Sequence, residues 1–316
     1  MRRRMTSSCR RAVSGFAVLA GACFLLSAGP AWADYMSAVL ADNPVSYWRL
    51  NETGGNGTTM YDSVGYQDGT FVKAAAEDQS YLGSDGPRPP ANVGFPANNL
   101  APRFWGTRAD EPGATYSGWS RVDVPDSPEL SITGSLTLEA WVNMENYGAG
   151  SRGIIAKWFG AFGINDRCYS LSYDKNGKLS FGISANGTFA GGKEAGGASV
   201  LPLDTWTHVA AVYTAGTSME IFINGVSDAK LTTGVPASVF DSSRPLMIGT
   251  TFETDNGDYC FRGRIDDAAV YDYALSAGQI AAHYDAAFIP IPEPGTLALL
   301  ATGLLGLLCY AWKRRK

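Results

Sequence analysis

The sequence predicts an all-β protein, an antiparallel β-sandwich with one short helix near its C-terminus. Three observations favour this fold class. Short runs of alternating apolar and polar residues recur through the middle of the chain, turn residues separate these runs, and no series of helices alternates with them. With 17% charged and 12% aromatic residues among 316, the chain is too apolar for a disordered protein and can bury a core.

The first 33 residues have the composition of a secretory signal peptide. A basic start with five arginines precedes an apolar stretch from Gly15 to Ala28, and Ala31-Trp32-Ala33 supplies the small residues of a cleavage site. We expect cleavage after Ala33 and export of the remaining chain.

The exported part begins with two short segments, "PVSYWRLNE" (44–52) and the turn-rich "DSVGYQDGTF" (62–71). The next segment, from 73 to 131, is longer and richer in proline, as in "DGPRPPANVGFPANNLAPRFWG". It is interpreted as an insertion or a long loop.

Clear strand patterns follow from residue 135 onward. In "SLTLEAWV" the apolar residues share one face and the residues between them lie on the other, which predicts a strand with two distinct faces. The two sets are Leu136, Leu138, Ala140 and Val142, and Thr137, Glu139 and Trp141. "YSLSYDKNGKLSFGIS" predicts a hairpin around Asn176-Gly177, a pair that tolerates the positive φ angles of a type I′ turn.

Further strands and the helix complete the predicted domain. Four more runs predict strands: "WTHVAAVY", "MEIFINGV", "PLMIGT" and "GRIDDAAVY". "SAGQIAAHYDAA" predicts the helix, because Ser276 and Gln279 have the spacing of a capping box. We expect residues 34–288 to form one domain.

Taken in order, these segments resemble the LamG-like members of the concanavalin A-like lectin and glucanase superfamily. The resemblance rests on "PVSYWRLNE", "DSVGYQDGTF", "SLTLEAWV", "WTHVAAVY", "IFINGV" and "FRGRIDDAAVYDYALSAGQI". It implies a jelly-roll sandwich in which the first and last strands lie close together.

The C-terminal tail predicts a membrane-spanning helix. An apolar segment without charge runs from Gly295 to Trp312 and ends at four basic residues, Lys313 to Lys316. At about 18 residues it is at the short end of what spans a bilayer core, and the basic cluster places the C-terminus in the cytoplasm. We therefore expect a transmembrane helix over 295–312.

Pro292, Glu293 and Pro294 stand directly before this span. With the span and the basic cluster, over residues 289–316, they resemble the PEP-CTERM sorting signal. The resemblance implies recognition by exosortase, a membrane-embedded protease of Gram-negative bacteria that make exopolysaccharide. The protein would pause in the inner membrane, be cut near the triplet, and reach the cell surface or extracellular matrix; a plain C-terminal anchor is the alternative.

Charge excludes one class of partner. Nine of the 25 basic residues and none of the 30 acidic ones lie in residues 1–33 and 295–316, which leaves 16 basic against 30 acidic residues and a formal charge of −14. Such a surface repels nucleic acid and anionic lipid, and it favours cations such as calcium.

Calcium, which is common in LamG-like relatives, is the predicted ion. Its predicted ligands are Asp62 and Asp266, with Asp267 beside the second and "ETDNGD" (253–258) as a poorer locus. In the alternative interpretation Asp62 caps a turn and Asp266 makes a buried hydrogen bond.

Cys168 and Cys260 are the two cysteines of the exported part. An even number in an oxidising compartment favours a disulfide between them, and two buried thiols are the alternative.

Catalytic patterns are weak. Retaining glycosidases need two carboxyl groups about 5 Å apart in one cleft. Glu253, Asp255 and Asp258 come nearest, but Asn256-Gly257 interrupts them with turn residues, and Glu139 is a lone acid on a strand face. We expect no catalytic residue.

The two histidines do not suggest a base or a metal site. His208 is interpreted as a packed or hydrogen-bonded core residue, and His283 as a surface residue of the helix. No cysteine or histidine cluster has the spacing of zinc ligands.

We expect an exported, noncatalytic protein whose LamG-like domain binds carbohydrate or protein, with exosortase and a glycan or exopolysaccharide as partners. Trp105, Trp119 and Trp158 lie outside the clearest strand patterns and are the better candidates for contact with a glycan. An architectural matrix protein that associates with its own kind and a divergent glycoside hydrolase are the alternatives.

Overall fold

The computed structural model describes residues 34–75, 79–106, 118–148, 150–160, 164–251 and 259–291, and short pieces of the tail at 303–305, 307–308 and 310–314. The predicted signal peptide and the Pro292-Glu293-Pro294 triplet lie outside the described residues, as does more than half of the predicted span at 295–312. No helix within the described residues is long and apolar enough to cross a membrane.

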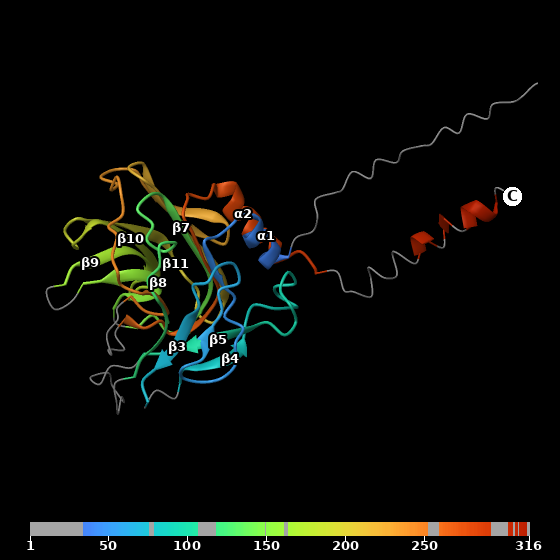
Figure 1. Ribbon diagram of the computed structural model, residues 1–316, viewed down its shortest axis with the longest axis horizontal. Helices are drawn as coiled ribbons and strands as arrows, with labels where there is room; N and C mark the ends of the chain where they lie inside the picture. The colour runs from blue at the N-terminus through green and yellow to red at the C-terminus, as the bar shows by residue number, and fades with distance from the viewer. Residues whose placement is uncertain are drawn as a thin grey trace, which may run out of the picture. The chain divides into compact units, whose positions relative to one another are not determined.

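Two antiparallel sheets pack against each other and confirm the predicted β-sandwich (Figure 1). The first sheet has the order β14 (Val226–Leu231), β13 (Ser218–Ile223), β12 (Trp206–Thr214), β7 (Leu136–Met144), β16 (Gly263–Tyr271), β5 (Leu100–Phe104) and β4 (Tyr81–Asp85), with β1 (Ser46–Trp48) also paired to β16. The second has the order β11 (Gly192–Val200), β10 (Lys178–Gly187), β9 (Asp166–Tyr173), β8 (Arg152–Phe159), β15 (Leu246–Ile248), β6 (Ser120–Val124), β3 (Gly69–Lys73) and β2 (Thr59–Met60).

The main core lies between the two sheets and follows from strand alternation. On β7 the apolar set predicted to share a face, from Leu136 to Val142, is fully buried in this core. On β10, Phe181 and Ile183 point into the same core from the second sheet. Since successive side chains of a strand point to opposite faces, the residues between them face outward.

Two helices cover the outer face of the first sheet. Helices α1 (Tyr35–Ala41) and α2 (Ala277–Ala286) lie side by side there (Figure 1), and a second apolar cluster that includes Trp141 fills the space beneath them. The predicted capping box of α2 is confirmed, because Ser276 Oγ accepts a hydrogen bond from Gln279 N and the Gln279 side chain binds Ser276 N in return.

Two sequence predictions about local structure are wrong. The hairpin between β9 and β10 forms, but only Gly177 has a positive φ (76°), and Asp174 accepts hydrogen bonds from Asn176 N and Lys178 N, so the turn is not type I′. Of the two interpretations of the 73–131 segment, the long loop is wrong, since the segment contributes β4 and β5 to the first sheet and β6 to the interior of the second, while the insertion stays a prediction.

Candidate functional site

An aromatic shelf lies on the outer face of the second sheet, where β8 to β11 run side by side. Trp158 of β8 lies over Gly182 of β10, so closely that a Cβ on this glycine would come 3.1 Å from the indole ring. Gly182 alternates with core residues and faces outward, which places Trp158 outside the main core. The turn between β10 and β11 carries Phe189, whose side chain is 62% exposed.

A cavity of about 200 Å³ lies against these two rings, and Gly192, Lys193 and Glu194 of β11 complete its lining. Gly192 lines the cavity directly, whereas the space above Gly182 is taken by the Trp158 ring. Burial raises the pKa of Glu194.

Arg167 of β9 supplies the shelf with a cation. Its guanidinium carbon lies 6.0 Å from the centre of the Trp158 ring and 5.7 Å from that of Phe189. Nη2 donates to Gly160 O at 2.8 Å, which fixes the side chain, and the buried Nε has no partner among the described residues. Burial lowers the pKa of Arg167. The shelf therefore combines apolar ring faces with charged groups that hydrogen-bond, a combination that suits the apolar faces and hydroxyl groups of sugars.

Each of the predicted calcium ligands, Asp62 and Asp266, has protein partners in the structure. Asp62 is held by backbone amides, since Oδ1 accepts from Tyr47 N (2.9 Å) and Val64 N (3.0 Å) and Oδ2 accepts from Gln67 N (3.3 Å). No group of three or more His, Cys, Asp or Glu side chains among the described residues could hold a metal ion. Calcium stays a prediction; "ETDNGD", with Glu253, Asp255 and Asp258, lies outside the described residues.

Asp266 lies in a β-bulge of β16, together with Asp267. The pairing with β7 shifts register between Asp266 and Ala269, and Asp267 has a φ of 48°, so these neighbours do not alternate as strand residues normally do. Asn99 Nδ2 donates to Asp266 Oδ2 at 2.6 Å, and the Tyr47 hydroxyl donates to Asp267 Oδ1.

Both carboxyl groups are buried. Burial and the neighbouring charge of Asp267 raise the pKa of Asp266 well above its usual range. Burial also raises the pKa of Asp267, to about 6, although Arg49 and a hydrogen bond from Tyr47 act in the opposite direction. Asp266 Oδ1 and Asp267 Oδ2 are buried without a hydrogen-bond partner among the described residues.

The predicted disulfide is not formed, because both cysteines are buried thiols in the structure. Cys168 lies near one end of β9, next to Arg167, which pairs with Trp158. Cys260 lies near the opposite end of β9, because its carbonyl accepts a hydrogen bond from Arg152, and Arg152 pairs with Tyr173. These ends are about 17 Å apart at the usual rise of a strand, whereas a disulfide needs Cα atoms within about 7 Å.

Glu139 is not a lone acid but the centre of a buried polar network. His208 Nε2 lies 2.6 Å from Oε1, and His283 Nδ1 lies 3.0 Å from both carboxylate oxygens. Tyr35 and Tyr271 donate their hydroxyl groups to the same carboxylate at 3.2 and 3.3 Å. The network therefore ties α1, α2 and the first sheet together.

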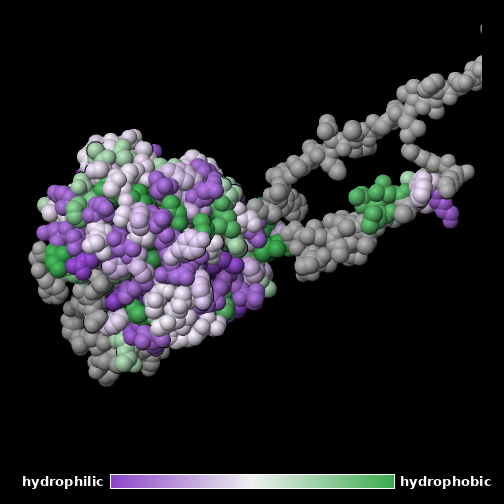
Figure 2. Space-filling view, viewed as in Figure 1, coloured by the Kyte–Doolittle hydropathy of each residue, from purple (hydrophilic) through white to green (hydrophobic). Residues whose placement is uncertain are grey.

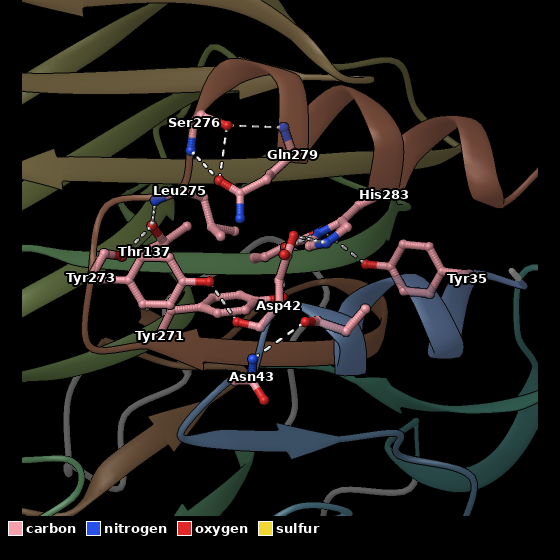
Figure 3. Close-up of polar contacts among 12 residues, drawn as sticks. Tyr35, Asp42, Asn43, Thr137, Tyr271, Tyr273, Leu275, Ser276, Gln279 and His283 are labelled. Carbon is pink, nitrogen blue, oxygen red and sulfur yellow. Dashed lines mark hydrogen bonds and ion pairs between the residues drawn. The ribbon is translucent and has the colours of Figure 1, made fainter. Parts of the chain in front are cut away.

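His283 reaches from α2 to Asp42 at the end of α1, with Nε2 3.0 Å from Asp42 Oδ2 (Figure 3). The prediction that His283 lies at the surface is wrong, since it is 1% exposed; that His208 is a hydrogen-bonded core residue is confirmed. Burial alone would lower the pKa of His283, but the carboxylates of Glu139 and Asp42 raise it. Burial likewise opposes ionisation of Glu139, yet the charge of His283 and hydrogen bonds from both histidines hold its pKa well below the usual range.

Of the three tryptophans selected from sequence, only Trp158 lines the shelf. Trp105 packs against the guanidinium groups of Arg103 and Arg262, 4.5 and 5.3 Å from its ring centre, and Trp119 packs against that of Arg121 at 4.6 Å. Sequence analysis missed Phe189 and Arg167, whose only signals are an aromatic residue in a turn and a cation on an alternating strand.

Comparisons with known proteins support the resemblances drawn from sequence. A family model described as the concanavalin A-like lectin/glucanases superfamily matches residues 117–281. A model of the PEP-CTERM protein-sorting motif matches residues 290–316. No curated protein has a sequence that matches this one.

Solved structures share the fold at low identity. Domain 4 of AbnA, a GH43 extracellular arabinanase from Geobacillus stearothermophilus in complex with arabinotriose, matches with a TM-score of 0.51 at 15% identity, over 76% of this chain and 98% of that one. A structure of botulinum neurotoxin type C matches with a TM-score of 0.52 at 14% identity, over 78% of this chain and 52% of that one. Its description states that cell entry of this toxin depends on interaction with two ganglioside molecules. The binding domain of botulinum neurotoxin serotype G matches with a TM-score of 0.52 at 13% identity, over 77% of this chain and 50% of that one. The chain thus spans about half the length of these toxin chains.

Proposed function

The chain belongs to the concanavalin A-like lectin/glucanases superfamily and carries a PEP-CTERM sorting motif, and from this we propose that it is an exported, noncatalytic protein that binds carbohydrate on its aromatic shelf. The observation that carries the proposal is the exposed ring of Phe189 beside Trp158, with Arg167 against both rings and Glu194 in the same cavity. Aromatic faces pack on the apolar faces of sugar rings, and a few charged groups fix their hydroxyl groups.

The face of the sandwich shown in Figure 2 fits a hydrated ligand better than an extensive apolar partner. Hydrophilic residues and residues of intermediate hydropathy make up most of the face of the sandwich in Figure 2, and apolar ones are scattered. Fold relatives add support, because the arabinanase domain was solved with arabinotriose and the type C toxin is described as depending on gangliosides.

The sorting motif indicates a protein that is exported and sorted to the cell envelope or surface, as in Gram-negative bacteria, with processing by exosortase. We propose an intermediate anchored in the inner membrane by the predicted 295–312 helix before this cut. The exopolysaccharide of the same cell is then the ligand nearest to the mature protein.

The acidic residues at the shelf favour noncatalytic binding over hydrolysis. Its cavity has one carboxylate, Glu194, whereas glycoside hydrolysis uses two that flank the bond. Asp266 and Asp267 are only 0% and 1% exposed, so a polysaccharide chain does not reach their carboxyl groups from solvent.

A glycan array followed by affinity electrophoresis tests the proposal. The wild type should be retarded in gels cast with the polysaccharides that score, and Phe189→Ala should weaken binding about tenfold or more, equivalent to about 1.4 kcal/mol. Tyr66→Ala is the matched control, since Tyr66 is an aromatic residue that is 99% exposed elsewhere. Equal retardation of both variants would refute the shelf. Self-association without glycan binding would favour an architectural protein, and release of reducing ends would favour a hydrolase.

Calcium is tested separately by chelation. A structural ion at Asp62 would make the melting temperature fall on addition of EDTA, and Asp62→Asn would abolish that response. An unchanged melting temperature would leave Asp62 as a turn cap.

A further inference from the structure

Two adjoining cavities lie on the outer side of the first sheet, beside the start of α1. Each has a volume of about 240 Å³, and Arg49 and Pro96 line both. Asp34 and Asp267 line the first cavity, and three asparagines line the second: Asn51, Asn98 and Asn99. Together the cavities reach the lower end of the size range of small-molecule sites, about 300–1,000 Å³.

The backbone around these cavities adopts conformations that non-glycine residues avoid. After β1 ends at Trp48, Leu50 has a φ of 57°, which turns the chain between Arg49 and Asn51. On β16 the bulge and the φ of 48° at Asp267 bring its carboxyl group to the first cavity. Such conformations cluster at sites that position particular side chains.

Two buried polar atoms at the cavities lack a protein partner. Arg49 Nε is a donor, lies 4.0 Å from Asp267 Oδ1, beyond hydrogen-bonding distance, and makes no hydrogen bond. Asn99 Oδ1 is an acceptor on a residue that is 1% exposed, and its amide nitrogen already donates to Pro87 O and Asp266. A buried polar atom without a partner is costly unless a ligand or water completes its hydrogen bonds.

The charged residues that line the cavities exclude anionic and cationic ligands and favour a neutral one. An anion would suit Arg49 but is opposed by Asp34, Asp267 and the formal charge of the exported part. A cation would suit the carboxylates but is opposed by Arg49, which lies between the two cavities. A hydroxyl group both donates and accepts, so it matches an unpaired donor and an unpaired acceptor together.

We infer that these cavities form a second binding site, which takes one neutral sugar ring by its hydroxyl groups. Arg49 and Asn99 hydrogen-bond the hydroxyl groups, Asn98 contacts the ring at the exposed rim, and Phe95 offers an apolar face within the first cavity. None of the residues of the aromatic shelf takes part. The site therefore goes beyond the proposed function, and a negative result for one of the two sites does not bear on the other.

Saturation-transfer NMR and calorimetry with a panel of neutral monosaccharides test this site. At least one sugar should bind with a stoichiometry of one in the Phe189→Ala variant, in which the shelf is disabled. Arg49→Lys keeps the charge but loses the Nε donor, and it should weaken binding about tenfold or more. Asn98→Ala, at an exposed position, should weaken binding without any effect on folding.

Arg88→Lys is the matched control, since Arg88 pairs with Asp85 on the surface and lines neither cavity. Melting temperatures equal to the wild type confirm that each variant is folded. Three results would overturn the inference: no neutral monosaccharide binds Phe189→Ala, binding survives both Arg49→Lys and Asn98→Ala, or inorganic phosphate or calcium binds here in place of the sugar. Loss of polysaccharide binding on the aromatic shelf, by contrast, would not contradict the inference of this second site.

Discussion

Replacing Glu139 by glutamine removes the one charge at the centre of the buried network while keeping the volume of the side chain. The carboxylate accepts hydrogen bonds from two histidines and two tyrosines. A glutamine has one acceptor oxygen, and its NH₂ group would face donors that the carboxylate now satisfies. His283 would also lose the carboxylate that stabilises its charged form.

Removing one partner of a fully buried charged pair costs about 3–5 kcal/mol. Domains of this kind have a total stability of about 5–15 kcal/mol, so Glu139→Gln should remove a large fraction of it. For a domain of about 150–250 residues each kcal/mol shifts the melting temperature by about 2–4 °C, which predicts a fall of roughly 6–20 °C.

Denaturation in urea followed by tryptophan fluorescence measures this change, because the Trp141 ring lies 5.4 Å from His208 and its emission reports the network. Glu220→Gln is the control, since Glu220 pairs with Lys230 in a partly exposed ion pair and should cost less than about 1 kcal/mol. A Glu139→Gln variant within about 1 kcal/mol of the wild type would refute the idea that the network fastens the helices to the sheet.

Three further outcomes are expected. The pKa of His283 is raised above 6.5 and that of Asp267 is raised to about 6, so each group binds more protons in the folded protein than in the unfolded chain; the free energy of unfolding measured in urea should fall as pH rises, through Asp267 between about 4 and about 6 and through His283 from about 6.5 upward, and a rise above pH 6.5 would contradict the shift of His283. Cys168 and Cys260 should resist iodoacetamide in the native protein and both react in guanidinium without reductant, as mass spectrometry would detect; protection after unfolding would restore the predicted disulfide. Deletion of 292–294 should leave an uncut, membrane-retained form, and normal processing on a gel would argue against sorting.

Alternation and capping residues were sufficient to predict much of the fold. β7 has four apolar residues in phase, and every second position enters the core. The Ser276 and Gln279 pair fixed the start of α2 to the residue. β4 and β5 gave no comparable signal, because each has five residues and Pro102 interrupts the pattern of β5. Their place in the sheet depends on pairing with distant strands, which local sequence does not encode.

The candidate sites were harder to predict, because periodicity specifies the face on which a residue lies but not what covers that face. Glu139 was placed on the correct side of β7, yet helices that precede and follow the sheet in sequence bury it, and this burial turns a lone acid into a partner of His283. Phe189 is the opposite case, since it lies in the turn between β10 and β11 and is 62% exposed, beside the 6% exposed Trp158 and the guanidinium of Arg167. The buried Glu139 holds the domain together, whereas the exposed ring of Phe189 remains available to a ligand.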